Sequence, residues 1–226
     1  IMSRGLGDVY KRQPLASMHG YVETLLLKND ALGEEERLRY LEITRKHSLH
    51  LRRLIGDLFE LSKLEAAGVE PALEWFSLAE LLHDVAQEFE LEAREKGIAI
   101  GVETRPDDSM VHADIGLIQR VLENLIRNAL KHTPRDGSIT ISLSEKPGSV
   151  AVAVADTGCG IAENELEHIF DRFYRSKNTP EAKTDSTGLG LAIVKRILDL
   201  HGSRITVASR PDHGTRFEFD VPARAA

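Results

Sequence analysis

Two asparagines four residues apart, Asn124 and Asn128, are the residues whose type and spacing point most directly to chemistry. They fall in an apolar-periodic segment over residues 114–132, where this spacing puts both side chains on one helix face, close to Lys131. Asparagine has poor helix propensity, so two on one face need partners, and a buried hydrogen-bonded pair is one interpretation. The other is a ligand site, because an amide oxygen can ligate Mg²⁺ and a lysine amine neutralises phosphate charge.

Two glycine-rich segments follow. Residues 156–161, Asp-Thr-Gly-Cys-Gly-Ile, end an apolar strand with a carboxylate that can accept a hydrogen bond from an exocyclic amine such as that of adenine. A tight turn without a ligand is the alternative. Residues 187–191, Thr-Gly-Leu-Gly-Leu, open a predicted helix, where free N–H groups and the helix dipole favour phosphate. They are neither the dinucleotide fingerprint, because Ile193 stands at the third glycine position, nor a P-loop, because the chain has no Gly-Lys-Ser/Thr.

The residues between these glycine segments suggest a hinge and lid. Aromatic residues within 170–175 precede a hydrophilic stretch that begins at Ser176, a combination typical of segments that close over a ligand. An ordinary surface loop is the alternative. The single cysteine, Cys159, is interpreted as a small residue between glycines, because no partner base is recognisable. No histidine has metal-ligand spacing, although His132 follows Lys131 at the phosphate site.

Two helices joined by a short turn are predicted ahead of these motifs. Apolar residues recur at helical spacing over 15–28, turn residues fill 29–33, and a second helix is expected over 34–67. A stripe that steps by four and three residues, the spacing of a bundle seam, runs along the second helix: His47, Leu51, Leu54, Leu58 and Leu61. Because such a hairpin cannot bury its seam alone, residues 14–67 are predicted to dimerise into a four-helix bundle.

The remaining chain is predicted to mix helices and strands. Residues 68–75, which begin Gly-Val-Glu-Pro, break the helix and form a linker. Periodicity predicts helices over 78–96, 114–132 and 189–201, and strands over 98–104, 138–144, 149–156, 204–209 and 215–221. Helices and antiparallel strands in this order favour an α+β fold in which the hairpin precedes a two-layer α/β sandwich over residues 76–226.

Composition and charge exclude several classes of protein. The chain has 226 residues, is 42% hydrophobic and 29% charged, and contains one cysteine, which excludes collagen-like, disulfide-rich and wholly disordered chains. A single cysteine also excludes an internal disulfide and fits a reducing compartment. The net charge of −7 argues against nonspecific nucleic-acid binding. No apolar run approaches the ~18 residues of a membrane span, so neither nucleic acid nor membrane is expected as a partner of this part.

The order of the motifs resembles that of sensor histidine kinases of two-component systems. Segments 124–134, 156–161, 170–175, 187–191 and 213–217 are similar to the family's N, G1, F, G2 and terminal glycine boxes. The resemblance covers nearly all of residues 14–222 and implies a dimerisation and histidine-phosphotransfer hairpin followed by a Bergerat-type (GHKL) ATPase domain.

The resemblance also implies roles for individual residues. Asn128 would hold Mg²⁺ and act with Lys131 in catalysis, Asn124 and His132 would line the triphosphate, and Asp156 would read the adenine amine. Residues 176–186 would form the ATP lid. The remaining residues implied to bind ATP shape the base pocket or engage phosphates: Gly158, Gly160, Ile161, Arg175, Thr187, Gly188, Leu189, Gly190, Leu191 and Thr215.

One departure from the family concerns the phosphoacceptor. The family motif His-Glu-x-x-Thr-Pro-Leu aligns with residues 9–15, which places Val9 at the histidine, Tyr10 at the acid and Gln13 at the threonine. His19 lies ten residues further on and is not a substitute. The chain as written is therefore expected to bind ATP without autophosphorylating in the family's manner.

The first thirteen residues are interpreted as an artefact. Residues 3–13 can be written in ordinary codons as a transposase adapter used in DNA sequencing libraries, so we hypothesise that the natural sequence starts at Pro14. A disordered tail is the alternative. Reading the locus from intact, adapter-free DNA tests this, because recovery of the same codons would contradict it.

Three functions are compatible with this sequence. In the first, the parent protein transfers the γ-phosphoryl group of ATP to histidine and then to an aspartate of a response regulator. In the second, the chain is a catalytically silent ATP-binding dimer. The third, an ATP hydrolase of the same superfold, uses a glutamate where this chain has Asn124, and the adjacent Glu123 points about 100° away around the helix. The resemblance further implies a cytoplasmic location, with the parent protein attached to the bacterial inner membrane.

Overall fold

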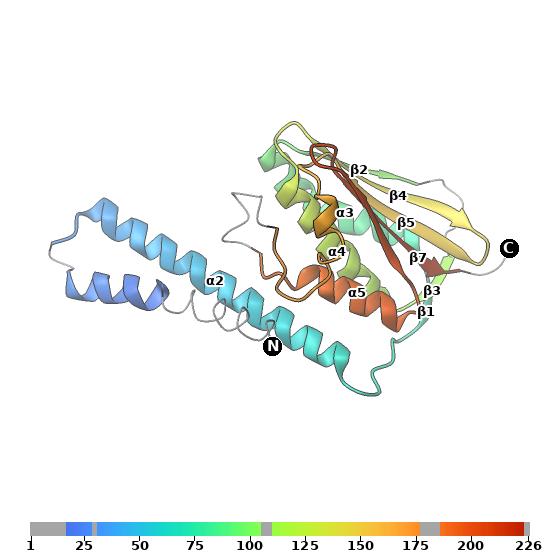
Figure 1. Ribbon diagram of the computed structural model, residues 1–226, viewed down its shortest axis with the longest axis horizontal. Coiled ribbons are helices and arrows are strands. Elements are labelled where there is room, and N and C mark those ends of the chain that lie inside the picture. Colours follow the sequence, from blue (N-terminus) through green and yellow to red (C-terminus); the bar gives the residue numbers. More distant parts are fainter. Residues whose placement is uncertain (1–16, 29–30, 105–109, 177–185, 224–226) are drawn as a thin grey trace.

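The computed structural model describes residues 17–28, 31–104, 110–176 and 186–223 of the chain. A long helical hairpin leads into a mixed α/β region, and one helix of the hairpin continues along the α/β region (Figure 1). The expected architecture of a hairpin followed by an α/β sandwich is therefore confirmed. The expectations for residues 1–16, including Val9, lie outside the described residues.

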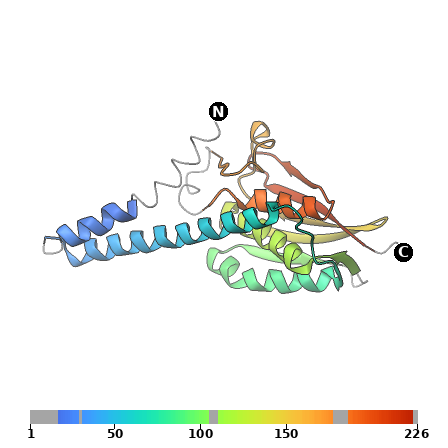
Figure 2. The ribbon, with the colours of Figure 1, turned by 90° about the horizontal axis from the view of Figure 1, so that it is seen from below.

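The hairpin consists of a short helix and a long one. Residues 17–27 are helical and lie against the first half of α2 (Glu34–Glu65), a continuous helix of 32 residues (Figures 1 and 2). The rings of Tyr21 and Tyr40 contact each other across the pair in a tilted arrangement, with centroids 5.4 Å apart. Leu38 and Leu41 of α2 remain 59% and 50% exposed, so a single chain leaves apolar surface on its hairpin. Gly56 lies within α2 directly before residues 57–65, and the side chains of Asp57 and Glu60 contact the α/β region.

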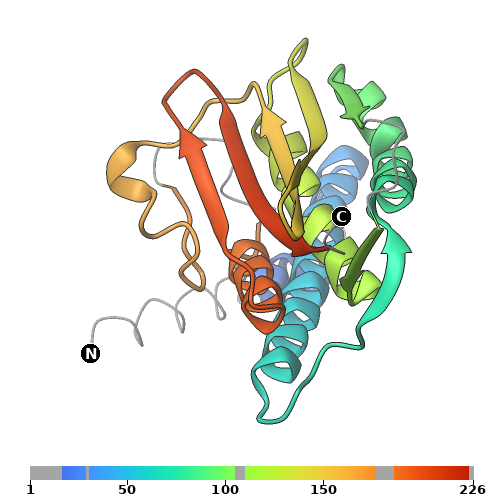
Figure 3. The ribbon, with the colours of Figure 1, turned by 90° about the vertical axis from the view of Figure 1, so that its right-hand side faces the viewer.

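The α/β region contains two sheets. The main sheet has the strand order β2-β4-β5-β7-β6, and a two-stranded sheet pairs β1 with β3. Figure 3 shows helices on one face of the main sheet. The strands are β1 (Glu74–Ser77), β2 (Ala99–Glu103), β3 (Met110–Ala113), β4 (Ser138–Lys146), β5 (Ser149–Asp156), β6 (Ile205–Ser209) and β7 (Thr215–Pro222).

Local signals fix the ends of the helices. Helix α3 (Leu78–Lys96) begins after Ser77, whose hydroxyl accepts a hydrogen bond from the backbone N–H of Glu80, and ends at Gly97 in the left-handed conformation with φ 69°. Helix α4 (Ile115–His132) begins after Asp114, whose carboxylate accepts from the N–H of Leu117 at 3.0 Å. A single 3₁₀ turn, η1 (Glu163–Glu165), and the helix α5 (Gly190–Leu200) complete the region.

The core lies between the helices and the main sheet. Helix α4 buries a stripe at three- and four-residue spacing, with Ile118, Leu122 and Leu125 at most 1% exposed. Strand β7 alternates in burial and turns Phe217 and Phe219 toward the helices. Leu61 and Leu64 of α2 belong to the same hydrophobic cluster, so the second half of α2 is packed as part of the α/β region.

Two features of the sheets differ from the sequence prediction. Strand β2 pairs with β4 in parallel rather than antiparallel fashion, which is possible because the long connection between them runs through β3 and α4. The short strands β1 and β3 were not predicted, and β1 begins at Glu74, inside the range expected to be linker. These strands are four residues long, too short for alternation to identify them.

Candidate functional site

Helix α4 lies at the centre of the expected site and contacts both glycine segments. At its middle, Asn124 donates its amide N–H to the backbone oxygen of Arg120 at 2.8 Å, which holds the amide oxygen in one orientation. A Cβ atom on Gly190, the first residue of α5, would lie 2.9 Å from that oxygen. A side chain at position 190 would therefore press on the end of the Asn124 side chain, which would have to move.

Asn128 has a side chain suited to a ligand. It lies one turn beyond Asn124, is partly buried, and its amide makes no hydrogen bond with any of the described residues. A partly buried amide without such a bond favours a ligand over the buried asparagine pair considered as the alternative. Its oxygen is a hard donor of the kind that Mg²⁺ prefers, so the residues present fit this ion.

The C-terminal end of α4 contacts the first glycine segment. The backbone oxygen of His132 accepts a hydrogen bond from the N–H of Cys159 at 3.3 Å. A Cβ atom on Gly158 would lie 2.5 Å from the same oxygen, so a side chain at this position would push the segment away. Burial, and secondarily the charge of Lys131, lowers the pKa of His132 from 6.5 to about 4. The imidazole is therefore neutral at pH 7.

Asp156 ends β5 as a fixed, partly buried carboxylate. Burial raises its pKa, while hydrogen bonds from the N–H groups of Gly158 and Thr215 act in the opposite direction. The bond from Gly158 is 2.8 Å long. These contacts aim the carboxylate while leaving lone pairs for a further donor, as recognition of an adenine amine requires.

Ser209, which the sequence analysis did not identify, links the first glycine segment to the residues around the start of β7. The Ser209 hydroxyl accepts a hydrogen bond from the N–H of Ile161 at 2.8 Å and lies 3.0 Å from the Thr215 hydroxyl. It also donates to the backbone oxygen of Gly214 at 2.8 Å. Serine near the end of a strand carries no distinctive pattern, so only the fold reveals this role.

The second glycine segment is held at both sides. The N–H of Phe173 donates to the backbone oxygen of Gly188 at 2.7 Å, and the Thr187 hydroxyl accepts from the N–H of Leu189 at 3.3 Å. Gly188 has φ 69°, and a Cβ atom there would lie 2.8 Å from the backbone of Phe173. The side chain of Leu189 is fully buried, so only backbone groups of this residue can meet a ligand. Arg175 is described and partly buried, whereas residues 177–185 of the expected lid lie outside the described residues.

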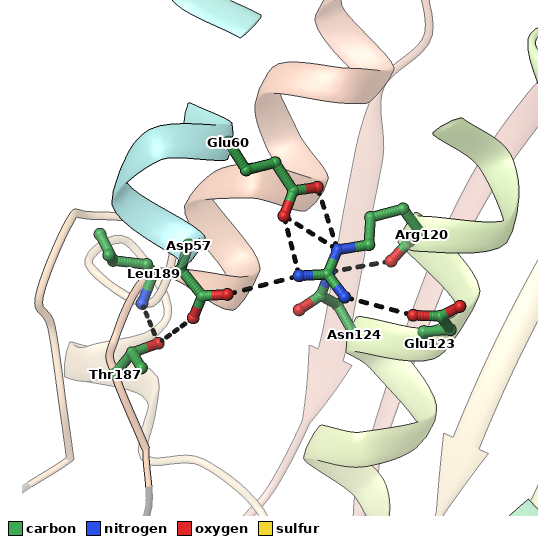
Figure 4. Close-up of polar contacts among 7 residues, drawn as sticks. All are labelled: Asp57, Glu60, Arg120, Glu123, Asn124, Thr187 and Leu189. Atoms are coloured by element: carbon green, nitrogen blue, oxygen red, sulfur yellow. Dashed lines mark hydrogen bonds and ion pairs between the residues drawn. The ribbon is translucent and has the colours of Figure 1, made fainter. Parts of the chain in front are cut away.

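An ionic cluster joins this site to α2 (Figure 4). Arg120 of α4 contacts Glu60 of α2 at 2.8 Å, Asp57 of α2 at 3.3 Å and Glu123 of its own helix at 3.2 Å. Burial alone would lower the pKa of Arg120, but hydrogen bonds and charges from Glu60, Glu123 and Asp57 raise it above the ordinary value. Sequence reasoning missed the contact of Arg120 with α2, because more than 60 positions separate Arg120 from Asp57.

Two segments of the chain match known families. Residues 113–225 match the family described as histidine kinase-, DNA gyrase B-, and HSP90-like ATPase, and residues 12–67 match the His Kinase A (phospho-acceptor) domain. The sensor histidine kinase WalK of Bacillus subtilis is 33% identical over 216 residues, which cover 93% of this chain and 34% of WalK. The chain therefore spans about a third of the length of curated relatives such as this one.

Solved structures give the same picture. Full-length ShkA in complex with AMPPNP is 30% identical, has a TM-score of 0.71, and matches over 95% of this chain and 47% of ShkA. The histidine kinase ThkA in complex with the response regulator protein TrrA is 28% identical, has a TM-score of 0.79, and matches over 99% of this chain and 61% of that chain. Across the described parts of this chain, no helix has an apolar stretch that could span a lipid bilayer.

Proposed function

Because the chain belongs to the sensor histidine kinase family, we propose that residues 76–226 bind ATP and Mg²⁺ as the catalytic domain of such a kinase. We propose further that residues 14–67 form the dimerisation and phosphotransfer hairpin. The intact parent protein would transfer the γ-phosphoryl group of ATP to a histidine and from there to an aspartate of a response regulator.

One observation carries the ATP-binding proposal: a single helix contacts both glycine segments. Asn124 of α4 faces Gly190 at the start of α5, and the C-terminal end of α4 receives the N–H of Cys159. In this proposal, α4 would set the position of adenine recognition at Asp156 relative to phosphate binding at the start of α5. The complex of the related ShkA with AMPPNP supports the same ligand class.

Each residue of the site has a definable task in this proposal. The oxygen of Asn128 would hold Mg²⁺, which neutralises phosphate charge when bound. Lys131 would place a further positive charge beside the phosphates, and the N–H groups at the start of α5 would donate to them. Because His132 is neutral at pH 7, it can act there as a hydrogen-bond donor through one ring nitrogen. The domain acts mainly by positioning and charge neutralisation.

The silent-module alternative depends on Val9. Valine has no nucleophile, so a chain that carries it binds ATP without accepting phosphate at that position. We propose this behaviour for the chain as written and kinase activity for a parent that carries histidine in its place.

The hydrolase alternative is disfavoured by the environment of Glu123. Its carboxylate accepts from the side-chain amide of Gln119 at 3.1 Å and from Arg120 at 3.2 Å. Both oxygens of this carboxylate thus already accept hydrogen bonds from neighbouring side chains, so it is not placed to take a proton from a water molecule in the site. Asn124, which occupies the position that the hydrolases use, carries no base.

The experiment incubates the chain with Mg²⁺ and ATP labelled at the γ-phosphate. A matched variant carries Val9→His, Tyr10→Glu and Gln13→Thr, which restore the family motif. We expect nucleotide binding by both proteins and acid-labile label only on the variant. Label on His19 of the original chain would refute the silent state, and failure of both proteins to bind nucleotide would refute the proposed function.

Partners and location are part of the same proposal. The exposed leucines of the hairpin support a homodimer through residues 14–67, and the complex of ThkA with TrrA supports a response regulator as the second partner. We propose that this part of the protein is cytoplasmic and that the parent is attached to the bacterial inner membrane. Size-exclusion chromatography with light scattering tests the dimer, which a monomer at micromolar concentration would contradict.

A further inference from the structure

Three polar side chains stand in one row across the end of the main sheet. Strand β7 pairs with β5 on one side and β6 on the other, and the register sets Thr215 opposite both Asp156 and Ser209. Residues directly opposite each other project from the same face of a sheet. Phe217, two positions after Thr215, shows that this is the face covered by the helices (Figure 3). Thr215 therefore stands between a carboxylate and a second hydroxyl.

The hydroxyl of Ser209 has its hydrogen-bonding capacity almost filled by backbone groups. A serine hydroxyl has one hydrogen to donate and two lone pairs that accept. The backbone oxygen of Gly214 can only accept, so it takes the Ser209 hydrogen at 2.8 Å. The backbone N–H of Ile161 can only donate, so it occupies one lone pair of the Ser209 oxygen, also at 2.8 Å. The other lone pair remains for the Thr215 hydroxyl, 3.0 Å away.

This arrangement fixes the direction of the Thr215 hydroxyl. Because Gly214 takes the hydrogen of Ser209, the hydrogen bond between the two hydroxyls runs from Thr215 to Ser209. The opposite direction would leave the oxygens of Ser209 and Gly214 2.8 Å apart with no hydrogen between them. The Thr215 oxygen thus keeps its lone pairs for a further partner but has no hydrogen to give.

The neighbouring carboxylate of Asp156 also offers only lone pairs. The N–H groups of Gly158 and Thr215 donate to it, and hydrogen bonds to the charged form of a carboxyl group favour that form. A charged carboxylate accepts hydrogen bonds and cannot donate them. Asp156 and Thr215 therefore present adjacent acceptors to a ligand beside the first glycine segment.

We propose that Ser209 is a positioning residue that determines base specificity. By holding the Thr215 hydrogen, it makes this wall of the site accept hydrogen bonds only, which selects a base with an exocyclic amine and rejects one with a keto oxygen in its place. Adenine carries the amine, whereas hypoxanthine and guanine carry a keto oxygen that would face the lone pairs of Thr215. The inference rests on the proposed function, because it assumes that the base lies against Asp156.

The test compares ATP with inosine triphosphate (ITP), whose base is hypoxanthine, by calorimetric titration of the full chain in the presence of Mg²⁺. The original chain should bind ITP at least about tenfold more weakly than ATP, because a site built to hydrogen-bond a substrate N–H group rejects an analogue that lacks it. In Ser209→Ala the Thr215 hydrogen is free to turn toward a keto oxygen. The ratio of the two dissociation constants, ITP over ATP, should therefore fall at least about fivefold, the effect of one hydrogen bond.

Thr206→Val is the matched control for loss of a hydroxyl from β6. The Thr206 hydroxyl donates to the backbone oxygen of Glu218 at 3.3 Å. It lies on the opposite face of the sheet, because an odd number of positions separates Thr206 from Ser209 in the same strand. The ratio for this variant should stay within twofold of the original. A purely structural defect would weaken ATP and ITP alike, so the ratio separates the proposed role of Ser209 from a merely structural one.

A double-mutant cycle tests the route through Thr215. Thr215→Val removes the acceptor oxygen and keeps the shape of the side chain, so it should lower the ratio by itself, even if Ser209→Ala alone fails to fold. Adding Ser209→Ala to Thr215→Val should then change the ratio by less than twofold. A further fall of the ratio in the double variant would overturn the route through Thr215.

The remaining outcomes separate this inference from the proposed function. An unchanged ratio in Ser209→Ala, or equal affinity of the original chain for ATP and ITP, would overturn the inference and leave the proposed function intact, because ATP would still bind. Absence of ATP binding by the original chain would overturn the proposed function itself.

Discussion

Replacement of Gly160 by alanine is expected to damage both the stability of the chain and its affinity for ATP. Gly160 stands in the first glycine segment with φ 67°, a conformation that disfavours side chains. A Cβ atom there would lie 1.9 Å from the backbone oxygen of Arg210. Gly202, after α5, is the matched control, because it has φ 66° and nothing within 4 Å of the position of a Cβ atom.

Gly160→Ala and Gly202→Ala both place an alanine in the left-handed backbone conformation, but only Gly160→Ala also creates a steric clash. The left-handed conformation costs an L-residue about 1–2 kcal/mol, and this should be the whole loss in Gly202→Ala. In Gly160→Ala the contact with Arg210 is to backbone, so no side-chain rotation relieves it and the segment must move. Overpacking of this kind adds about 1–3 kcal/mol, which brings the expected loss to about 2–5 kcal/mol.

Urea unfolding followed by the fluorescence of the single tryptophan, Trp75 in β1, measures the loss of stability of the α/β region. Titration with ATP and Mg²⁺ measures the second effect. Displacement of residues 156–161 should weaken binding by at least about tenfold, equivalent to 1.4 kcal/mol, whereas Gly202→Ala should stay within twofold. Equal losses of stability in the two variants, or unchanged affinity in Gly160→Ala, would refute the assignment of this segment to the nucleotide site.

Three further predictions concern charge, protonation and metal. Asp156→Asn should raise the free energy of unfolding at pH 7, because burial disfavours the charged carboxylate. The same substitution should weaken ATP binding about 10- to 100-fold through loss of a charge-assisted hydrogen bond. Urea unfolding should show the gain in stability, and calorimetry on the same sample should show the loss of affinity. The pKa of His132 is about 4 when folded and 6.5 otherwise, so its contribution to stability is complete above pH 6.5 and is lost as the pH falls toward 4. Between pH 7 and 4.5, the free energy of unfolding measured in urea should therefore fall by about 2–3 kcal/mol less in His132→Gln than in the original chain. Equal decreases in the two proteins would contradict the neutral imidazole. Chelation of Mg²⁺ should weaken ATP binding at least about tenfold in the original chain but little further in Asn128→Ala; equal sensitivity of the two would remove Asn128 from the metal site.

Elements defined by neighbouring residues could be predicted from the sequence. Helix α3 has the bounds expected from periodicity, because Ser77 and Glu80 at its start and Gly97 at its end act on adjacent backbone. Strands β4 and β5 were predicted from their periodicity, and in the structure they pair in antiparallel fashion across a turn in which Gly148 has φ 76°. In both cases the deciding interactions lie within a few residues along the chain.

Contacts between distant residues could not be predicted in this way. The pairing of β1 with β3 matches Phe76 with Val111, across a whole helix and a further strand. For the proposed site, spacing on one helix pointed to Asn124 and Asn128, and a carboxylate at the end of an apolar strand pointed to Asp156. Neither kind of signal pointed to Asp57 or Ser209, whose partners are brought to them only by tertiary packing.

Gly56 is a flexible point in α2 between the part of the helix that belongs only to the hairpin and the part that is packed on the α/β region. At about 1.5 Å per residue the 32 residues of α2 form a rod about 48 Å long. Its last nine residues, 57–65, are fastened to the α/β region, and Gly56 stands directly before them with no neighbouring atoms around the position of a Cβ. Because glycine weakens a helix by about 0.5–1 kcal/mol relative to alanine, bending concentrates at this point. A rotation of the free end of the hairpin would therefore bend α2 next to Asp57. Gly56→Ala would stiffen the helix at this point and change how far such a rotation displaces residues 57–65.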